Sequence, residues 1–393
     1  MISSLLSSVH ILQFENLPGK DLFHILSFAA GKQEGLKVAA IFDNAPIPTR
    51  KSLLAELEEH CTLLRFDSVE PNPKSSDIQD MYEDSRFKEA DLVLGIGGGS
   101  VLDSAKALAM LGTNGGKLDE YLGNAPKRKI EKKNLPLVLI PTTAGTGSEV
   151  TKVGVYTSET GRKHTLGSPL MSAHAALLVG SFLDSIPPTL CAATGLDALD
   201  HALESIWNKN ATPITRKAAE DAAIYVLTHL PPLYRAIVQK KEGRTLLQKE
   251  MLVSSTMAGI AFNMTGTAAG HAISFILSEE WHVPHGSACA FSLLEVFDWA
   301  AENQDTERSL ARIAQHFHPG TTDEKKLVIL LREQIAALMQ EMRIPHTFKQ
   351  LGVELEQEDI ASLFARCFSD PKMHNQIPPM HEADLYALLG SKL

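Results

Sequence analysis

The sequence predicts two domains: an α/β N-terminal domain with a parallel sheet over residues 1–185, and an all-α C-terminal domain over residues 186–393. A chain of 393 residues is longer than one ordinary domain. Its first half alternates short apolar runs with longer stretches of helical period, which is typical of parallel strands joined by helices. After Ile186 the segments are rich in alanine, leucine and glutamate and have helical period.

Three apolar runs in the first half are too short for helices and are predicted to form buried strands. They are residues 37–42, 91–96 and 135–140. In the second half the clearest predicted helices are residues 215–230 and 325–342. Pro187 and Pro188 mark the joint between the halves, because proline restricts its own backbone and that of the residue before it.

Composition excludes several classes of function. The net charge of −10 disfavours binding to the phosphate backbone of nucleic acids, and the basic run 127–133 is interpreted as a solvated loop. Four cysteines lie far apart without a Cys-x-x-Cys pair, which favours reduced, mostly buried thiols. Residues 1–14 lack the pattern of a secretion signal, and no apolar stretch has the length of a membrane span. We therefore expect a cytoplasmic protein with no membrane partner.

A glycine-rich turn follows the predicted strand 91–96. Gly97, Gly98 and Gly99 let the backbone approach a ligand, and Ser100 is predicted to cap the next helix with Asp103 at its third position. The start of that helix would then attract a pyrophosphate. The spacing differs from Gly-x-Gly-x-x-Gly, so a plain tight turn is the alternative interpretation.

A second loop, residues 141–149, also follows a predicted strand and carries several small hydroxyl side chains. Two such loops at the carboxyl ends of parallel strands are typical of a cofactor site. Asp43 closes the strand 37–42, where an acid accepts hydrogen bonds from a ribose and repels a 2′-phosphate, which favours NAD over NADP. The alternative is an aspartate that merely forms the turn.

A candidate metal site begins in the helical half. Asp197 and His201 are four residues apart, which places a carboxylate and an imidazole on one helical face. Asp200 and Glu204 are interpreted as pointing elsewhere, as solvated or structural residues. The alternative interpretation of the Asp197–His201 spacing is a simple surface pair.

Two further histidines complete the candidate set. His271 stands near the start of an apolar helix, and His285 follows a proline and precedes another apolar segment. A single histidine in either place is more often a structural residue. Three imidazoles with one carboxylate, however, suit iron or zinc and leave coordination open for a substrate oxygen.

Taken together, these motifs resemble the iron-containing (group III) alcohol dehydrogenase family over nearly the whole chain. The matching segments are residues 70–73, 97–100 with Asp103 and Lys106, 141–151, 195–204 and 284–286. The resemblance implies a Rossmann-like domain and a helical domain in the dehydroquinate synthase-like architecture, with both ligands in the cleft between them. It also implies a homodimer.

The resemblance assigns roles to individual residues. The implied metal ligands are Asp197, His201, His271 and His285. The implied cofactor contacts are Asp43, Asn72, Gly97, Gly98, Gly99, Ser100, Asp103, Thr142, Thr143, Thr146, Ser148 and Lys163. The implied cofactors are Fe²⁺, with Zn²⁺ or another divalent ion as the alternative, and NAD(H) in preference to NADP(H).

The expected function is that of a metal-dependent NAD(P)-linked alcohol dehydrogenase, or aldehyde reductase, acting on a small alcohol or aldehyde. The metal serves as a Lewis acid on the substrate oxygen while hydride moves to or from the nicotinamide. Two departures from the family pattern stand out. Phe275 replaces a second histidine that is frequent in the family, so His282 becomes the candidate proton relay, with a surface role as the alternative. Residues 179–181 replace an Asp-Pro pair that is frequent in the family.

Three rival interpretations stay open. A dehydroquinate synthase-type lyase shares the domain plan but is expected to use glutamate as its carboxylate ligand. A maleylacetate reductase-like enzyme reduces a double bond without metal. A non-catalytic binding protein on the same fold is the third. The Asp197–His201 pair and the complete donor set favour the dehydrogenase.

Overall fold

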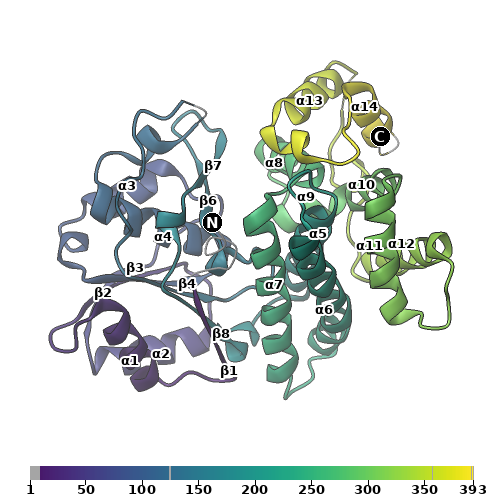
Figure 1. The fold of residues 1–393 in the computed structure, drawn as a ribbon. Coiled ribbons are helices and arrows are strands. Elements are labelled where there is room, and N and C mark those ends of the chain that lie inside the picture. Colours follow the sequence, from purple (N-terminus) through teal and green to yellow (C-terminus); the bar gives the residue numbers. More distant parts are fainter. Residues whose placement is uncertain (1–8, 124, 356, 391, 393) are drawn as a thin grey trace. The chain divides into compact units, whose positions relative to one another are not determined.

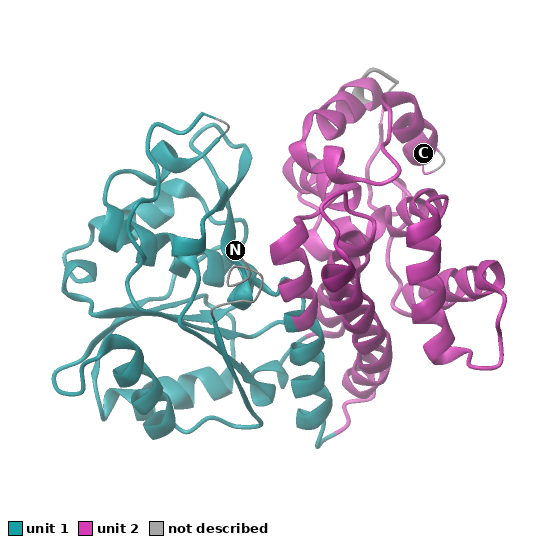
Figure 2. Cartoon of the chain, viewed as in Figure 1, with its two compact units in different colours: residues 1–186, 242–256 teal, residues 187–241, 257–393 magenta. Residues whose placement is uncertain are grey.

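The computed structural model describes residues 9–123, 125–355, 357–390 and 392. The chain forms two compact units (Figure 2): unit 1 takes residues up to Ile186 together with Glu242–Thr256, and unit 2 takes Pro187–Lys241 and Met257 onward. Helix α7 (Thr245–Thr265) therefore contributes to both units. The sequence prediction had assigned residues 242–256 to the helical half, since their local pattern is the same as that of its other helices.

Unit 1 is built on a six-stranded sheet in the order β1-β8-β5-β4-β2-β3, with every neighbouring pair parallel. The strands are β1 (His10–Phe14), β2 (Lys37–Phe42), β3 (Thr62–Phe66), β4 (Leu92–Gly97), β5 (Leu137–Pro141) and β8 (Ala175–Val179). The three predicted strands are β2, β4 and β5, with ends shifted by up to two residues. The prediction of a parallel-sheet α/β domain followed by a helical domain is confirmed.

Helices cover both faces of this sheet. They are α1 (Gly19–Ala30), α2 (Pro48–Glu58), α3 (Ser75–Glu83) and α4 (Gly99–Asn114). Figure 1 shows α1 and α2 on one face and α3 and α4 on the other. The side chains of β4, β5 and β8 are buried throughout, as expected for parallel strands covered on both faces. A separate antiparallel hairpin consists of β6 (Val153–Thr157) and β7 (Lys163–Gly167).

The start of α4 differs from the sequence prediction. Gly98 is the N-cap, and no side chain caps the helix, so the prediction that Ser100 is the cap was wrong. Gly98 already has extended backbone, and the helix therefore begins two residues early and leaves Asp103 beyond its first turn. Ser100 Oγ instead accepts a hydrogen bond from the Asn72 N–H at 3.2 Å. The first N–H groups of α4 are thus left for a ligand.

Unit 2 consists of helices. They are α5 (Pro188–Ile206), α6 (Pro213–Val238), α8 (Ala269–Trp281), α9 (His285–Phe291), α10 (Leu293–Ala300), α11 (Gln304–Phe317), α12 (Glu324–Glu341), α13 (Gln357–Ser369) and α14 (Glu382–Gly390). The predicted helices 215–230 and 325–342 lie within or nearly coincide with α6 and α12. Helix α5 packs against α6 and α9, and its side chains from Gly195 to Ile206 are all buried. It is the central helix of this unit.

Short 3-10 helices connect several of these elements. They are η1 (Phe87–Glu89), η2 (Leu118–Tyr121), η3 (Ser148–Val150), η4 (Pro169–Met171), η5 (Gly180–Leu183) and η6 (Pro371–Asn375). η6 packs on α8 and so belongs to the surroundings of the candidate metal centre.

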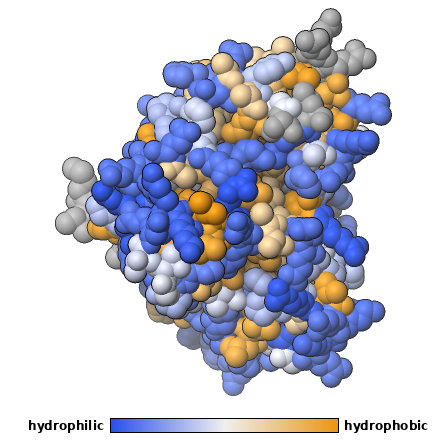
Figure 3. All heavy atoms as spheres, turned by 90° about the vertical axis from the view of Figure 1, so that its right-hand side faces the viewer, coloured by the Kyte–Doolittle hydropathy of each residue, from blue (hydrophilic) through white to orange (hydrophobic). Residues whose placement is uncertain are grey.

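Hydrophilic side chains dominate the face of the molecule in Figure 3, with hydrophobic ones in small groups between them. Among the described residues no single helix has the length and apolar character of a membrane span; α7 and α8 meet that criterion only as a pair bent by 104°. All four cysteines are free, and three of them are buried. The stretch 1–8, part of the segment tested above for a secretion signal, lies outside the described residues.

Candidate active site

Helix α5 presents two of the predicted metal ligands on one buried face. Asp197 and His201 are 1% and 4% exposed, and His201 Nδ1 lies 3.6 Å from Asp197 Oδ1. The four-residue spacing on a regular helix produces this proximity, as the sequence pattern predicts. The surface-pair interpretation does not apply, because both side chains are in the interior of unit 2.

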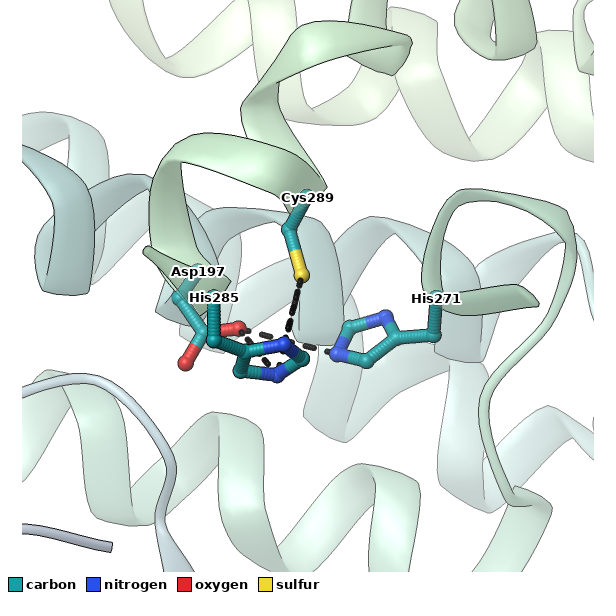
Figure 4. A group of neighbouring side chains, drawn as sticks. All are labelled: Asp197, His271, His285 and Cys289. Carbon is teal, nitrogen blue, oxygen red and sulfur yellow. Dashed lines mark hydrogen bonds and ion pairs between the residues drawn. The ribbon is translucent and has the colours of Figure 1, made fainter. Parts of the chain in front are cut away.

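Helices α8 and α9 bring His271 and His285 to the same place. Asp197 Oδ1 lies 3.6 Å from His271 Nε2 and 3.8 Å from His285 Nε2 (Figure 4). Gly286 permits this approach, because a Cβ there would lie only 2.2 Å from the carbonyl oxygen of Ala193 on α5. The backbone of α9 thus packs directly on α5 and sets His285 beside Asp197.

These separations fit a shared divalent ion. Two nitrogen or oxygen donors about 2.0–2.1 Å from a tetrahedral ion lie about 3.3 Å apart, which is close to the distances found around Asp197 Oδ1. Asp197 Oδ1 and His271 Nε2 are buried, and neither makes a hydrogen bond with the described residues. Buried polar atoms in native proteins are normally bonded, so convergent unbonded donors indicate a ligand. The residues present therefore fit a metal ion.

His201 occupies a flanking position. Its ring stacks on Phe262 with centroids 4.2 Å apart and lies 4.3 Å from the His271 ring. The four side chains that each bring a donor atom within 4.8 Å of the other three are Asp197, His271, His285 and Cys289. The structure thus brings all four predicted ligands together, with His201 at the edge, and adds Cys289.

For two carboxylates next to His271, the prediction that they point elsewhere and the solvated interpretation were wrong, and the structural alternative applies. Asp200 and Glu204 are fully buried, contrary to a solvated position. Glu204 Oε2 lies 2.8 Å from His271 Nδ1, and Asp200 Oδ2 lies 3.2 Å from the same nitrogen. Glu204 also accepts hydrogen bonds from the backbone N–H groups of Ala268 and His271. With Nδ1 bonded to a carboxylate, Nε2 of His271 is the nitrogen that can face a metal.

Buried carboxylates and imidazoles shift one another's pKa values in this cluster. Burial opposes the ionisation of Asp197, but the imidazoles of His201, His271 and His285 outweigh it and hold the pKa of Asp197 below its usual range. Burial, followed by the charge of Glu204, raises the pKa of Asp200 to about 7. Three buried carboxylates close together favour a bound cation.

The candidate proton relay, His282, does not belong to the group of converging donor atoms. His282 is exposed and ends α8 with positive φ, and its backbone N–H donates to the Leu277 carbonyl oxygen. The place of the missing family histidine is occupied by Phe275, whose ring centroid lies 6.1 Å from that of His285. Lys372 of η6 stands over the Phe275 ring at 3.6 Å and pairs with Asp370. The exposure of His282 supports the surface interpretation of that residue.

In unit 1 the predicted cofactor loops follow three neighbouring strands. Asp43 follows β2, Gly97 to Gly99 end β4 and begin α4, and Thr142 follows β5. Because these strands are parallel and adjacent, their carboxyl ends share one edge of the sheet. A hydrogen bond from Thr142 N–H to Gly97 O, at 3.0 Å, joins two of the loops directly.

Gly99 is required by the neighbouring Thr146. A Cβ on Gly99 would lie 2.7 Å from Thr146 Cγ2, whereas a Cβ on Gly98 would meet Thr143 at an ordinary 3.5 Å. The two loops therefore pack backbone against side chain at the start of α4. This arrangement leaves the uncapped helix end and the threonine hydroxyls on the same side of the sheet.

Asp43 has two structural partners. Its Oδ1 accepts hydrogen bonds from Arg50 at 2.8 Å and from the Ala45 N–H at 2.9 Å, as the turn-forming interpretation requires. Arg50 is buried and also donates to the backbone oxygens of Asp43 and Ala45. Oδ2 of Asp43 makes no hydrogen bond within the described residues, so the turn role and a ribose contact are compatible.

Two predicted cofactor contacts are engaged within the protein. Asp103 accepts hydrogen bonds from the Ser148 hydroxyl at 2.6 Å and from the Val155 N–H at 2.8 Å. Lys106 is completely buried and donates to Ser148, Thr151 and the Val153 carbonyl. Asp103 and Ser148 therefore link α4 to the segment after β5, and we do not carry them into the proposed cofactor site.

The last two predicted cofactor residues lie near each other in unit 1. Asn72 has a positive φ, and its carbonyl accepts a hydrogen bond from Thr157 Oγ1 at 3.4 Å. Thr157 pairs with Lys163 across the β6–β7 hairpin. Since the Asn72 N–H donates to Ser100, Asn72 stands beside the start of α4, and Lys163 is linked to it through Thr157.

Comparison with known proteins agrees with this geometry. The model of the iron-containing alcohol dehydrogenase family matches residues 24–179, and that of its C-terminal domain matches residues 191–393. The chain belongs to the iron-containing alcohol dehydrogenase family. Long-chain-alcohol dehydrogenase 1 of Geobacillus thermodenitrificans is 31% identical over 326 residues, 82% of this chain and 80% of that protein.

Solved structures extend the similarity to the whole fold. A 1,3-propanediol oxidoreductase superposes with a TM-score of 0.84 at 25% identity, covering 97% of this chain and 98% of the other. A sulfoacetaldehyde reductase from Bifidobacterium kashiwanohense, in complex with NAD⁺, gives 0.84 at 26% identity, covering 98% and 97%. The chain is thus an oxidoreductase of the iron-containing alcohol dehydrogenase family, as the motif resemblance indicated.

The first prediction for this family member concerns Gly99. We expect Gly99→Ala to lower the free energy of unfolding by about 1–3 kcal/mol, because the added methyl overpacks against Thr146. Gly98→Ala is the matched control and should change it less. Combining Gly99→Ala with Thr146→Ser, which removes Cγ2, should restore most of the loss in urea unfolding. Equal effects of the two alanines would contradict the packing argument.

The second prediction concerns Glu204. Glu204→Gln should weaken divalent-metal binding by roughly 10–100-fold, because a neutral amide supports the His271 imidazole less well than a carboxylate. Isothermal titration of the metal-free protein measures this directly. Glu220→Gln is the control, since Glu220 is a buried helical carboxylate of the same unit that pairs with Arg312. Unchanged metal affinity in Glu204→Gln would remove Glu204 from the site.

Proposed function

We propose that the protein is a metal-dependent, NAD-linked alcohol dehydrogenase that interconverts a small aldehyde and its alcohol. The proposed ligands are Asp197, His201, His271 and His285, with Fe²⁺ as the ion implied by the family and Zn²⁺ as the alternative. The observation that carries the proposal is the convergence of buried, unbonded donor atoms, Asp197 Oδ1 and His271 Nε2, beside the buried carboxylates of Asp200 and Glu204.

A divalent metal would supply a Lewis acid for the substrate oxygen, and NAD would exchange the hydride. The protein's own residues prepare the site for both. Glu204 holds Nδ1 of His271 and so directs the opposite nitrogen toward Asp197. His285 is the most exposed of the predicted ligands, with 31% of its side chain accessible, and marks the side from which a substrate approaches.

The proposed NAD site lies at the edge of the unit 1 sheet. The uncapped start of α4, with Gly97, Gly98, Gly99 and Ser100, would bind the pyrophosphate, and Asp43 would accept a hydrogen bond from the ribose. Thr142, Thr143 and Thr146 would add hydroxyl contacts from the neighbouring loop, and Asn72 and Lys163 would flank it. The carboxylate of Asp43 supports NAD over NADP, and the NAD⁺-bound relative supports the same choice.

The test is oxidation of NADH, and separately of NADPH, by metal-stripped protein refilled with Fe²⁺ or Zn²⁺, against a panel of small aldehydes. We expect metal-dependent oxidation of NADH and slower oxidation of NADPH. The panel should include diol-derived, short and anionic aldehydes, because the relatives named above act on different alcohols. Metal binding without oxidation of either cofactor would favour the lyase or the binding-protein interpretation.

We also propose a cytoplasmic location and a homodimer. Four free cysteines suit a reducing compartment, which supports a cytoplasmic location. A homodimer is proposed from the family resemblance, and light scattering coupled to size exclusion tests it.

A further inference from the structure

Lys372 of η6 lies against an aromatic ring that borders the candidate metal centre. Its Nζ atom lies 3.6 Å from the centroid of the Phe275 ring on α8, well inside the distance of about 6 Å at which a cation and an aromatic face attract each other. The Lys372 side chain is only 18% exposed, and its Nζ atom lies 3.1 Å from Asp370 Oδ2. Burial lowers the pKa of Lys372, and the charge of Asp370 is the strongest effect that opposes this shift. Because little water surrounds the contact, it holds the ring more firmly than an exposed pair would.

The same ring packs on a predicted metal ligand. Phe275 and His285 meet edge-on, with ring centroids 6.1 Å apart and planes at 61°. The His285 ring also meets that of His271 edge-on, with centroids 5.5 Å apart and planes at 67°. His285 is the first residue of α9 and, with 31% of its side chain accessible, the most exposed of the predicted ligands. Neighbouring rings therefore restrict the orientation of an imidazole that stands at a helix end and is reached by solvent.

Hydrogen bonds tie η6 to the segment before α8. Asn375 Nδ2 donates to the Thr267 carbonyl oxygen at 2.9 Å, and the Lys209 N–H donates to the Asn375 carbonyl oxygen at 2.8 Å. Thr267 stands two residues before α8, the helix that carries both His271 and Phe275. η6 also packs along α8 itself. The cation of η6 is therefore held on a segment that is fixed to the helix of its aromatic partner.

We propose that Phe275 is a positioning residue for His285 and that Lys372 holds the Phe275 ring in place. A histidine that binds a metal needs a partner outside the ligand set to fix the direction of its ring. Glu204 does this for His271 through a hydrogen bond, whereas His285 is oriented through an aromatic contact. This inference rests on the proposed metal site and goes beyond it, because neither Phe275 nor Lys372 is a predicted ligand.

Binding of Co²⁺ to the metal-free protein tests the proposal without relying on catalysis, because the visible absorption bands of Co²⁺ report the geometry of its ligands. Phe275→Leu removes the ring. It should weaken Co²⁺ binding by roughly 2–10-fold, the factor that corresponds to one edge-on aromatic pair, and shift the visible bands. Lys372→Met keeps the apolar stem, loses the ammonium, and should shift the bands in the same direction with a smaller loss of affinity. Lys372→Arg keeps a cation that stacks on an aromatic face and should behave as the wild type.

A double-mutant cycle shows whether Lys372 acts through Phe275. If it does, Lys372→Met should cause no further loss of Co²⁺ affinity in the Phe275→Leu background. Lys88→Met is the matched control, because Lys88 Nζ lies 3.2 Å over the Tyr82 ring in unit 1. This control should leave both the affinity and the bands unchanged.

The outcomes separate this inference from the proposed function. Wild-type affinity and bands in Phe275→Leu would overturn the positioning role and leave the metal site intact. Additive losses in the cycle, or an equal loss in Lys88→Met, would overturn the role of Lys372. Failure of Co²⁺ and Zn²⁺ to bind the wild type would overturn the metal site itself, and this inference with it. Circular dichroism of each variant verifies that it is folded.

Discussion

His285→Ala is expected to lose the bound metal and to lower kcat/KM for aldehyde reduction by about 10³-fold or more. Lewis-acid stabilisation contributes several kcal/mol, and each 1.4 kcal/mol changes a rate tenfold. His285 is the first residue of α9 and is partly exposed, so removing its ring should leave the fold intact. Metal analysis of the purified variant and steady-state kinetics measure the two losses on the same sample.

His282→Asn is the matched control for this prediction. His282 is three residues away, exposed and in the left-handed region that asparagine tolerates, so the variant should keep its full metal content. If it also keeps its activity, His282 is a surface residue; if only activity falls, the proton-relay hypothesis gains support. Normal metal content in His285→Ala would exclude His285 as a ligand.

Lys106→Met is expected to lower the free energy of unfolding by about 3–5 kcal/mol. Burial lowers the pKa of Lys106 and raises that of Asp103, while each charge partly offsets the effect on the other. The Lys106 ammonium also bonds Ser148, Thr151 and the Val153 carbonyl. Methionine fills the same space but leaves these acceptors and a buried carboxylate without their cation.

Urea unfolding with two companion variants measures this effect. Lys32→Met removes an exposed ion pair with Asp91 and should change stability by no more than about 1 kcal/mol. The double variant Lys106→Met with Asp103→Asn should recover part of the loss, since the Asp103 charge is removed together with its cation and only the buried Glu149 still lacks the Lys106 charge. A Lys106→Met protein as stable as the Lys32→Met control would contradict the proposed role of this buried network.

The sequence predicts central strands better than edge strands, for a physical reason. Four strands, β2, β4, β5 and β8, lie inside the sheet and read as largely apolar runs, because both of their faces are covered. The sequence analysis predicted the first three and missed β8. Strands β1 and β3 are the two edges, and each carries a polar residue, Gln13 or Arg65, within its five residues. Because edge strands are partly exposed, polar residues interrupt the apolar run by which a buried strand is recognised in the sequence.

The predicted metal ligands could be found from the sequence because the residue types, the four-residue spacing of Asp197 and His201 and the family motifs all indicate the same site. Glu204 was misassigned although seven residues are nearly two full helical turns, which places it on the face of Asp197. Cys289 follows the same four-residue rule from His285 and could have been found by it. Lys372 could not, because only tertiary packing of η6 on α8 brings it to Phe275.

Reconstitution of the metal-free protein tests the central claim most directly. Zn²⁺ or Fe²⁺ is added in steps, and bound metal and the rate of NADH oxidation with an active aldehyde are measured on the same samples. The account predicts no oxidation without metal and a rate that rises in proportion to bound metal until one ion per chain is reached. Full oxidation by protein that contains no metal would contradict it.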